Sequence, residues 1–233
     1  MDKNSNAYTF IFAIIMVTLI AGLLAFTATS LKPLQEKNVK AEKMQKILST
    51  IGVEVSRDEA DASFSKYIKE QLSIKIDGAV DANSNAFTLN LKNEYKKKDD
   101  DASKRFPVYI AEKDGKTFYV VPLYGAGLWD AIWGYVALGE DKNTIVGVNF
   151  DHKGETPGLG AEITTGWYQA QYTGKKILDE NNNFVSVDAI KGGAKPGDAH
   201  GVDAISGGTI TSVGVNDMMK NRLKFVQSYF KNN

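Results

Sequence analysis

The segment DAISGGTITS, residues 203–212, gathers hydroxyl and glycine residues just before a helical pattern near the C-terminus. A hydroxyl such as that of Thr209 or Thr211 can accept hydrogen bonds from the free backbone N–H groups of a helix N-terminus, where a partial positive charge also resides. Gly207 and Gly208 let the backbone approach a ligand closely. The segment therefore suits either plain helix capping or a phosphate site in which a threonine hydroxyl is esterified.

A second segment, HKGETPGLGAE at residues 152–162, combines a histidine, two carboxylates, three glycines and a proline between a strand pattern and a helix pattern. Glu155 has no obvious partner in the sequence and His152 has no serine or cysteine nearby, so no general acid–base pair is evident. Glycine-dense loops that lead into a helix N-terminus commonly contact ligands. Ligand contact and a plain connecting loop are equally good interpretations of this segment.

A third segment, YGAGLWDAIWG at residues 124–134, contains G-x-G but lacks the third glycine of the dinucleotide fingerprint, so NADH is not expected to bind this chain. Trp129 and Trp133 offer flat aromatic area that suits a planar ring. Buried aromatic residues usually belong to the core. Core packing is therefore the preferred local interpretation of both tryptophans.

The composition of the 233 residues narrows the possible chemistry. Lys plus Arg and Asp plus Glu are both 28, and this neutral balance argues against nucleic acid as a partner. The absence of cysteine excludes disulfides, thiolate nucleophiles and cysteine-ligated clusters. Two histidines are too few for a histidine-built metal site, and no metal site or catalytic residue is predicted. Demanding chemistry would have to come from a cofactor.

Residues 4–31 contain no charged side chain and are mostly apolar, which is typical of a membrane-spanning helix. A cleaved signal peptide is the alternative, but the apolar run is longer than the usual core of such peptides. Lysines cluster directly after the run, and the positive-inside rule would then place the globular part in the cytoplasm. They are Lys32, Lys37, Lys40, Lys43 and Lys46.

The remaining patterns predict an α+β fold: an N-terminal single transmembrane helix and stalk, then a largely antiparallel sheet with flanking helices. Helices are expected in the amphipathic stalk up to Gly52, from Arg57 onward, over 161–172 and from Ser212. The charged run 93–105 and residues 191–201 are expected to be solvated loops. The expected strands are 74–77, 86–92, 106–112, 117–124, 131–138, 144–150 and 184–190.

Taken together, the three glycine-rich segments resemble those of a known family. DAISGGT resembles the flavinylation motif Asp-x-x-(Ser/Thr)-Gly-Ala-Thr of proteins with covalent FMN, except that Gly208 replaces the usual alanine. HKGETPGLGAE resembles the ETPGLG loop of the same FMN-binding domain. GLWDAIWGYVAL and IKGGAK resemble the C subunit of the Na+-translocating NADH:quinone reductase and favour it over the related G subunit of the Rnf electron-transport complex. The resemblance covers nearly the whole chain.

This resemblance implies an anchor at 1–31, a stalk at 32–56 and an FMN-binding domain at 57–233. It makes Thr209 the acceptor of one covalent FMN, attached from FAD by a flavin transferase that would recognise Asp203 and Ser206. By chemistry alone Thr211 is a competing acceptor, and only the register of the motif selects Thr209. The other expected FMN contacts are Gly125, Leu128, Trp129, Glu155, Thr156, Pro157, Gly158, Leu159, Gly160, Lys191, Gly207, Gly208 and Thr211.

The implied function is electron transfer within a membrane complex that passes electrons from NADH to ubiquinone and exports Na+, alongside the other subunits of that complex. The family places its FMN domain on the periplasmic side of the bacterial inner membrane. The lysine bias opposes this, but large domains are translocated largely regardless of charge, so a single-pass periplasmic placement is expected. The alternatives are a G-type Rnf subunit and a membrane-anchored binding module with no redox role.

Overall fold

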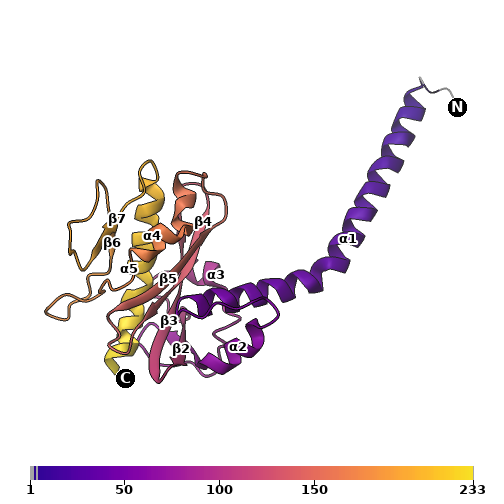
Figure 1. The fold of residues 1–233 in the computed structure, drawn as a ribbon. Coiled ribbons are helices and arrows are strands. Elements are labelled where there is room, and N and C mark those ends of the chain that lie inside the picture. Colours follow the sequence, from indigo (N-terminus) through magenta and orange to yellow (C-terminus); the bar gives the residue numbers. More distant parts are fainter. Residues whose placement is uncertain (1–2, 4, 233) are drawn as a thin grey trace. The chain divides into compact units, whose positions relative to one another are not determined.

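The computed structural model describes residue 3 and residues 5–232, and its contacts divide the chain into two units, Met1–Lys43 and Met44–Asn233 (Figure 1). The first unit consists of most of helix α1 (Asn6–Ser49), whose apolar window reaches a mean hydropathy of 2.6 with no residue of that window buried. Among the described residues, α1 alone has the length and composition to cross a membrane. Met1, Asp2 and Asn4 of the predicted anchor lie outside the described residues.

The helix α1 continues through Pro33 and ends three residues before Gly52, which has a φ of +67°. A left-handed residue just beyond a helix is a common way to end it, and glycine adopts that conformation without steric cost. The boundaries at 31/32 and 56/57 stay predictions. The division of the chain by its internal contacts follows Lys43 and coincides with neither of them.

The second unit is built on a five-stranded sheet in which every neighbouring pair is antiparallel, in the order β1-β2-β3-β4-β5. This arrangement confirms the predicted α+β class with a largely antiparallel sheet. Most of its strands are rich in β-branched and aromatic residues, and successive side chains along each strand point to opposite faces of the sheet. The strands are β1 (Ile68–Lys75), β2 (Arg105–Lys113), β3 (Lys116–Ala126), β4 (Ala131–Leu138) and β5 (Ile145–His152).

The C-terminal helix α5 (Thr209–Asn232) covers one face of the sheet and packs mainly on β3. Helix α5 lies close to β3 at two glycines, one in each element. A Cβ at Gly125 would lie 2.7 Å from Met218 Cβ, and a Cβ at Gly214 would overlap the Ala126 carbonyl oxygen. Gly125 thus serves helix packing, which fixes the height of the α5 N-terminus above the sheet.

The opposite face of the sheet is covered by α2 (Ala60–Tyr67), which packs on β1 and β2, and by the last turns of α1, where Lys46 and Ser49 bond Asp151 and Asn149 of β5. Ile47 and Leu48 are fully buried, and the Phe64 ring meets the Tyr109 ring edge-on at 6.0 Å. Because strand residues alternate between the faces, Tyr109 serves this layer and its neighbour Val108 serves the layer under α5. With both faces buried, the sheet is a rigid base for the loops at its edge.

Several predicted elements were wrong between residues 57 and 105. The helix expected from Arg57 ends at Tyr67, because the next eight residues form β1, which pairs with β2. The strand predicted over 86–92 does not form. There Asn85 Oδ1 accepts from Phe87 N (2.9 Å) and Asn90 Oδ1 caps α3 (Leu91–Lys96), so side chains capture backbone donors that a strand would need.

The charged run 93–105 is not wholly a solvated loop. Glu94 and Lys104 are buried, and Glu94 accepts from both Lys97 Nζ and Arg105 N. The run packs beside α5, because Lys104 Nζ lies 5.3 Å from the Phe225 ring centroid. The two buried charges each have an oppositely charged partner within the run, Lys97 for Glu94 and Asp99 for Lys104. Composition alone does not reveal this pairing.

The helix predicted over 161–172 is split into the 3-10 helix η1 (Gly160–Thr164) and α4 (Gly166–Ala170). The break is at Thr165, whose backbone is extended (φ −77°, ψ 146°). The strand expected at 184–190 is reduced to β6 (Asp188–Ile190), which pairs in parallel with β7 (Gly201–Asp203) as a separate two-stranded sheet. The loop predicted at 191–201 connects these two strands, and α5 begins at Thr209 rather than Ser212.

Candidate functional site

Thr209 opens helix α5 and lies in the wall between two cavities. We name them the Glu155 cavity, of about 250 Å3, and the Lys191 cavity, of about 480 Å3. Thr209 is half-buried and lines both. Of the predicted residues, the Glu155 cavity also brings together Leu128, Glu155, Thr156, Leu159, Gly160, Gly207, Gly208 and Thr211.

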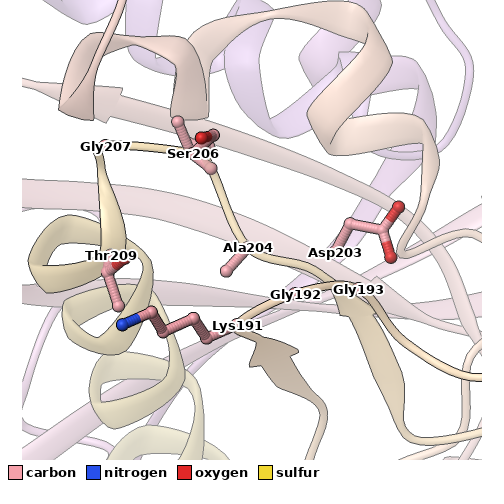
Figure 2. Close-up of a pocket in the computed structure, with 9 residues that line it drawn as sticks. Lys191, Gly192, Gly193, Asp203, Ala204, Ser206, Gly207 and Thr209 are labelled. Carbon is pink, nitrogen blue, oxygen red and sulfur yellow. The ribbon is translucent and has the colours of Figure 1, made fainter.

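The Lys191 cavity is lined by Lys191 and by the motif residues Asp203, Ser206 and Gly207 as well as Thr209. Figure 2 shows Lys191 and Thr209 at one end of the lining and the Asp203 carboxylate at the other. The motif aspartate therefore does not face the motif threonine. A cation and a helix N-terminus at one end of a cavity form a setting that favours an anion.

Asp203 has a specific partner that the sequence did not reveal. Its Oδ1 accepts from the backbone N of Ala194 at 2.7 Å, and its own N donates to Gln171 Oε1 at 2.8 Å. The intervening Gly192 and Gly193 have φ values of +87° and +102°, which favour glycine. Asp203 thus holds the loop that carries Lys191 against β7. The Gly-Gly pair was a visible signal for this loop, whereas Gln171 gave none.

Glu155 is the central acid of its cavity and is 4% exposed. Its Oε1 accepts from Trp129 N at 2.9 Å and its Oε2 accepts from Thr211 Oγ1 at 2.6 Å. Burial raises the pKa of this carboxyl, but the Thr211 hydroxyl and the amides of the 128–130 turn outweigh burial and lower the pKa below its usual value. The sequence showed no obvious partner for Glu155, because the Thr211 hydroxyl that bonds it lies 56 residues away.

The structure separates the two threonines that the sequence left in competition. Thr211 is 1% exposed and its hydroxyl is bound to Glu155. Ser212 instead fixes the turn before α5, because its Oγ accepts from Ile205 N at 3.1 Å and donates to the Gly208 carbonyl at 3.0 Å. Thr209, in contrast, lines both cavities and is not held by either of these contacts.

Gly207 and Gly208 form the turn that leads into α5. Gly207 has a φ of +75°, so a side chain there would be strained. Gly208 is the position where the motif usually has alanine, and a Cβ there would lie 2.8 Å from Ile205 Cγ2 and 3.1 Å from the Leu159 carbonyl carbon. The glycine therefore fits a tight turn, in which the ETPGLG loop packs directly against the start of α5.

Four predicted residues do not line the two cavities. Trp129 is 70% exposed, so its interpretation as a core residue was wrong, whereas Trp133 is half-buried. Gly125 and Trp129 border a separate open groove of about 300 Å3. Pro157 and Gly158 are exposed in the ETPGLG turn. Leu128, Leu159 and Ile210 form an exposed apolar rim on the Glu155 cavity, and Ile210 had not been predicted.

Comparisons with known proteins match this site and this fold. The family model described as the FMN-binding domain matches residues 127–224. The C subunit of the Na(+)-translocating NADH-quinone reductase of Vibrio anguillarum is 32% identical over 92% of this chain and 89% of that protein. The corresponding subunit of Haemophilus ducreyi is 31% identical over 94% and 90%.

Two solved structures are also similar. The crystal structure of the Na(+)-translocating NADH-quinone reductase C subunit from Parabacteroides distasonis has a TM-score of 0.79 and 38% identity, covering 87% of this chain and 98% of its own. That of Shewanella oneidensis NqrC has a TM-score of 0.72 and 32% identity, covering 83% and 96%. On these matches, the chain belongs to the C-subunit family of the Na+-translocating NADH-quinone reductase.

Proposed function

We propose that this chain is the membrane-anchored electron-transfer subunit of a Na+-translocating NADH:quinone reductase and carries one FMN through a phosphoester to Thr209. The observation that supports this most directly is the setting of Thr209. It is the half-buried first residue of α5, and it borders both cavities. The competing Thr211 hydroxyl is buried and bound to Glu155.

The residues around Thr209 fit both ends of an FMN molecule. A phosphate on Thr209 would lie at the N-terminus of a 24-residue helix, where free N–H groups and the helix dipole favour anions. Lys191 adds a positive charge to the same cavity. Leu128, Leu159 and Ile210 offer apolar surface suited to a planar ring.

Attachment requires an acceptor hydroxyl that a transferase can reach, and Thr209 lines two cavities. A flavin transferase would form a bond between Thr209 Oγ1 and the FMN phosphorus of FAD while the pyrophosphate bond breaks, releasing AMP and the hydroxyl proton. When bound, FMN supplies the redox chemistry that no side chain of this cysteine-free chain offers. Glu155, Thr211 and the 128–130 turn would then form a fixed wall beside it, and the ester would prevent loss of the cofactor.

Within the complex, the chain would relay electrons between other subunits on the route from NADH to ubiquinone, coupled to Na+ export. The names of its relatives support this role. The long apolar α1 supports a single-pass anchor in the bacterial inner membrane. The FMN domain would face the periplasm, and protease added to intact spheroplasts should then cleave it. Resistance until lysis would contradict this orientation.

The test of the flavin linkage is intact-mass analysis after co-expression with a flavin transferase. We expect the wild-type chain to gain the mass of FMN less water and to fluoresce in denaturing gels. Thr209→Ala should gain nothing, whereas Thr211→Val should still be labelled. Thr164→Ala is a matched surface control, because its hydroxyl bonds only to the local Ala161 carbonyl.

Three outcomes of this experiment would contradict the proposal. Labelling that survives Thr209→Ala would exclude this acceptor. Labelling that is lost only in Thr211→Val would move the linkage to Thr211. No flavin in the wild-type chain would favour a membrane-anchored module without a redox role.

A further inference from the structure

Glu155 is a buried carboxylate whose hydrogen bonds join three segments far apart in the chain. It bonds the Trp129 amide in the turn after β3 and the Thr211 hydroxyl in the first turn of α5, while it belongs itself to the ETPGLG loop. Its own backbone N donates to His152 Nδ1 at 3.1 Å, which ties it to the end of β5. The orientation of the Glu155 cavity's walls therefore depends on one side chain.

The surroundings of this carboxylate leave room for nothing larger than glycine at two points. A Cβ at Gly127 would lie 2.5 Å from Glu155 Oε1, and a Cβ at Gly160 would overlap Glu155 Oε2 and Thr211 Oγ1. Neither glycine is among those with a positive backbone φ, so the space for the carboxylate, and not the backbone conformation, requires them. The chain is thus built around an acid at this position.

The charge of Glu155 is not balanced by a cation. Among the described residues no lysine or arginine forms an ion pair with it, and the partners of its two oxygens are a hydroxyl and backbone amides. Buried structural acids are normally paired with a cation. Glu94, the other buried acid in the described part of the chain, follows that rule because Lys97 Nζ donates to it at 2.9 Å. An uncompensated carboxylate in a cavity wall acts strongly on whatever occupies the cavity.

We propose that Glu155 is a positioning residue that holds the three segments around Thr209 in place and whose buried negative charge lowers the redox potential of the flavin beside it. Only the effect on the flavin's redox potential rests on the proposed function. Reduction adds negative charge to a flavin, so a fixed anion in the wall disfavours the reduced form. The bracing role concerns the protein alone.

The experiment compares Glu155→Gln with Thr211→Val and Thr211→Ser. Glu155→Gln removes the charge of Glu155 with little change of shape. Thr211→Val keeps that charge but removes the hydrogen bond from Thr211 to Glu155. Thr211→Ser keeps both the charge and a hydroxyl at position 211. Hydrogen exchange of the Trp129 amide and of the first turn of α5 is measured in flavin-free protein. The midpoint potential of the attached flavin is measured by spectroelectrochemistry on protein whose FMN load is verified by mass.

We expect faster exchange than wild type in Glu155→Gln and Thr211→Val and wild-type exchange in Thr211→Ser. The potential should be clearly more positive in Glu155→Gln and should change less in Thr211→Val. Wild-type exchange in both altered proteins overturns the bracing role, and a wild-type potential in fully loaded Glu155→Gln overturns the electrostatic role. If Glu155→Gln does not fold, the valine and serine pair still decides the bracing role.

These outcomes separate the inference from the proposed function. A wild-type chain that gains no FMN contradicts the proposed function, yet exchange in flavin-free protein still tests Glu155. Normal FMN attachment with unchanged exchange contradicts the inference and leaves the proposed function standing.

Discussion

The two cavities that meet at Thr209 are built in different ways. The wall of the Glu155 cavity is held by a buried carboxylate whose bonds of 2.6 and 2.9 Å reach two other segments. The wall of the Lys191 cavity is a loop with two glycines at positive φ, held at Ala194 by an exposed aspartate. One wall is assembled by buried polar contacts between distant segments, and the other by local backbone freedom and a single surface contact.

Because of this difference, we expect the two cavity walls to have different roles. Buried, fully satisfied hydrogen bonds restrict geometry, so the Glu155 wall is suited to holding a ring in one orientation. Exposed glycine loops open at little cost, so the Lys191 loop is suited to admitting a donor and a transferase. Changes to the first wall should therefore affect stability and the flavin environment, and changes to the second should mainly affect attachment.

The largest effect is expected from crowding the Glu155 wall. In Gly160→Ala the new methyl would overlap Glu155 Oε2 and Thr211 Oγ1. Overpacking of this kind typically costs about 1–3 kcal/mol, and we expect about 2 kcal/mol less free energy of unfolding, measured by denaturant titration. FMN attachment should also fall, measured by intact mass.

The matched control for this change is Gly154→Ala in the same loop. A Cβ at Gly154 would meet no atom within 4 Å, so stability should stay within about 0.5 kcal/mol of wild type. Equal stability of the two variants would mean that the Glu155 wall is as pliable as an open loop, which would remove the contrast between the two cavities.

A smaller effect is expected at the other wall. Asp203→Ala removes the acceptor of the Ala194 amide, but water can replace it there, so the loss of stability should be about 1 kcal/mol or less. Attachment of FMN should slow in a time course followed by in-gel fluorescence, because the Lys191 loop is no longer held. Asp203→Asn keeps an accepting oxygen and should attach FMN faster than Asp203→Ala. If both variants are equally slow, the charge and not the hydrogen bond matters, as recognition by a transferase would predict.

The sequence predicted the parts of this molecule that depend on local pattern. The predicted strand 131–138 coincides with β4, because a short apolar run with β-branched and aromatic residues is a local signal of a buried strand. Residues 68–72 were wrongly assigned to a helix, because their lysine, glutamate and glutamine favour one and only pairing with β2 overrides that preference.

The candidate site could be predicted as a set of motifs but not as an arrangement. The position of Thr209 followed from a motif resemblance, whereas the contact between Glu155 and Thr211 depends on how the fold brings two distant segments together. The exposure of Trp129 could not be predicted either, since the turn after β3 directs it outward. Composition and motif spacing do not reveal which distant segments of a chain come into contact.

The smallest predicted effect is a pH dependence confined to the Glu155 wall. Because the pKa of Glu155 is lower in the folded chain than its usual value of 4.5, the unfolded chain binds its proton at a higher pH than the folded chain does. Its contribution to stability is then complete above about pH 4.5 and is lost as the pH falls through the folded pKa.

Glu155→Gln does not titrate, so the difference in unfolding free energy between wild type and this variant should be constant near neutral pH and move against wild type in acid. Denaturant titrations of both proteins from pH 7 to about pH 3.5 would measure it, and the subtraction cancels other acids with lowered pKa values, such as Asp130 and Asp141. A difference that instead moved in favour of wild type in acid would require a raised pKa, and the hydrogen bonds from Thr211 and the 128–130 turn would then be too weak to offset burial.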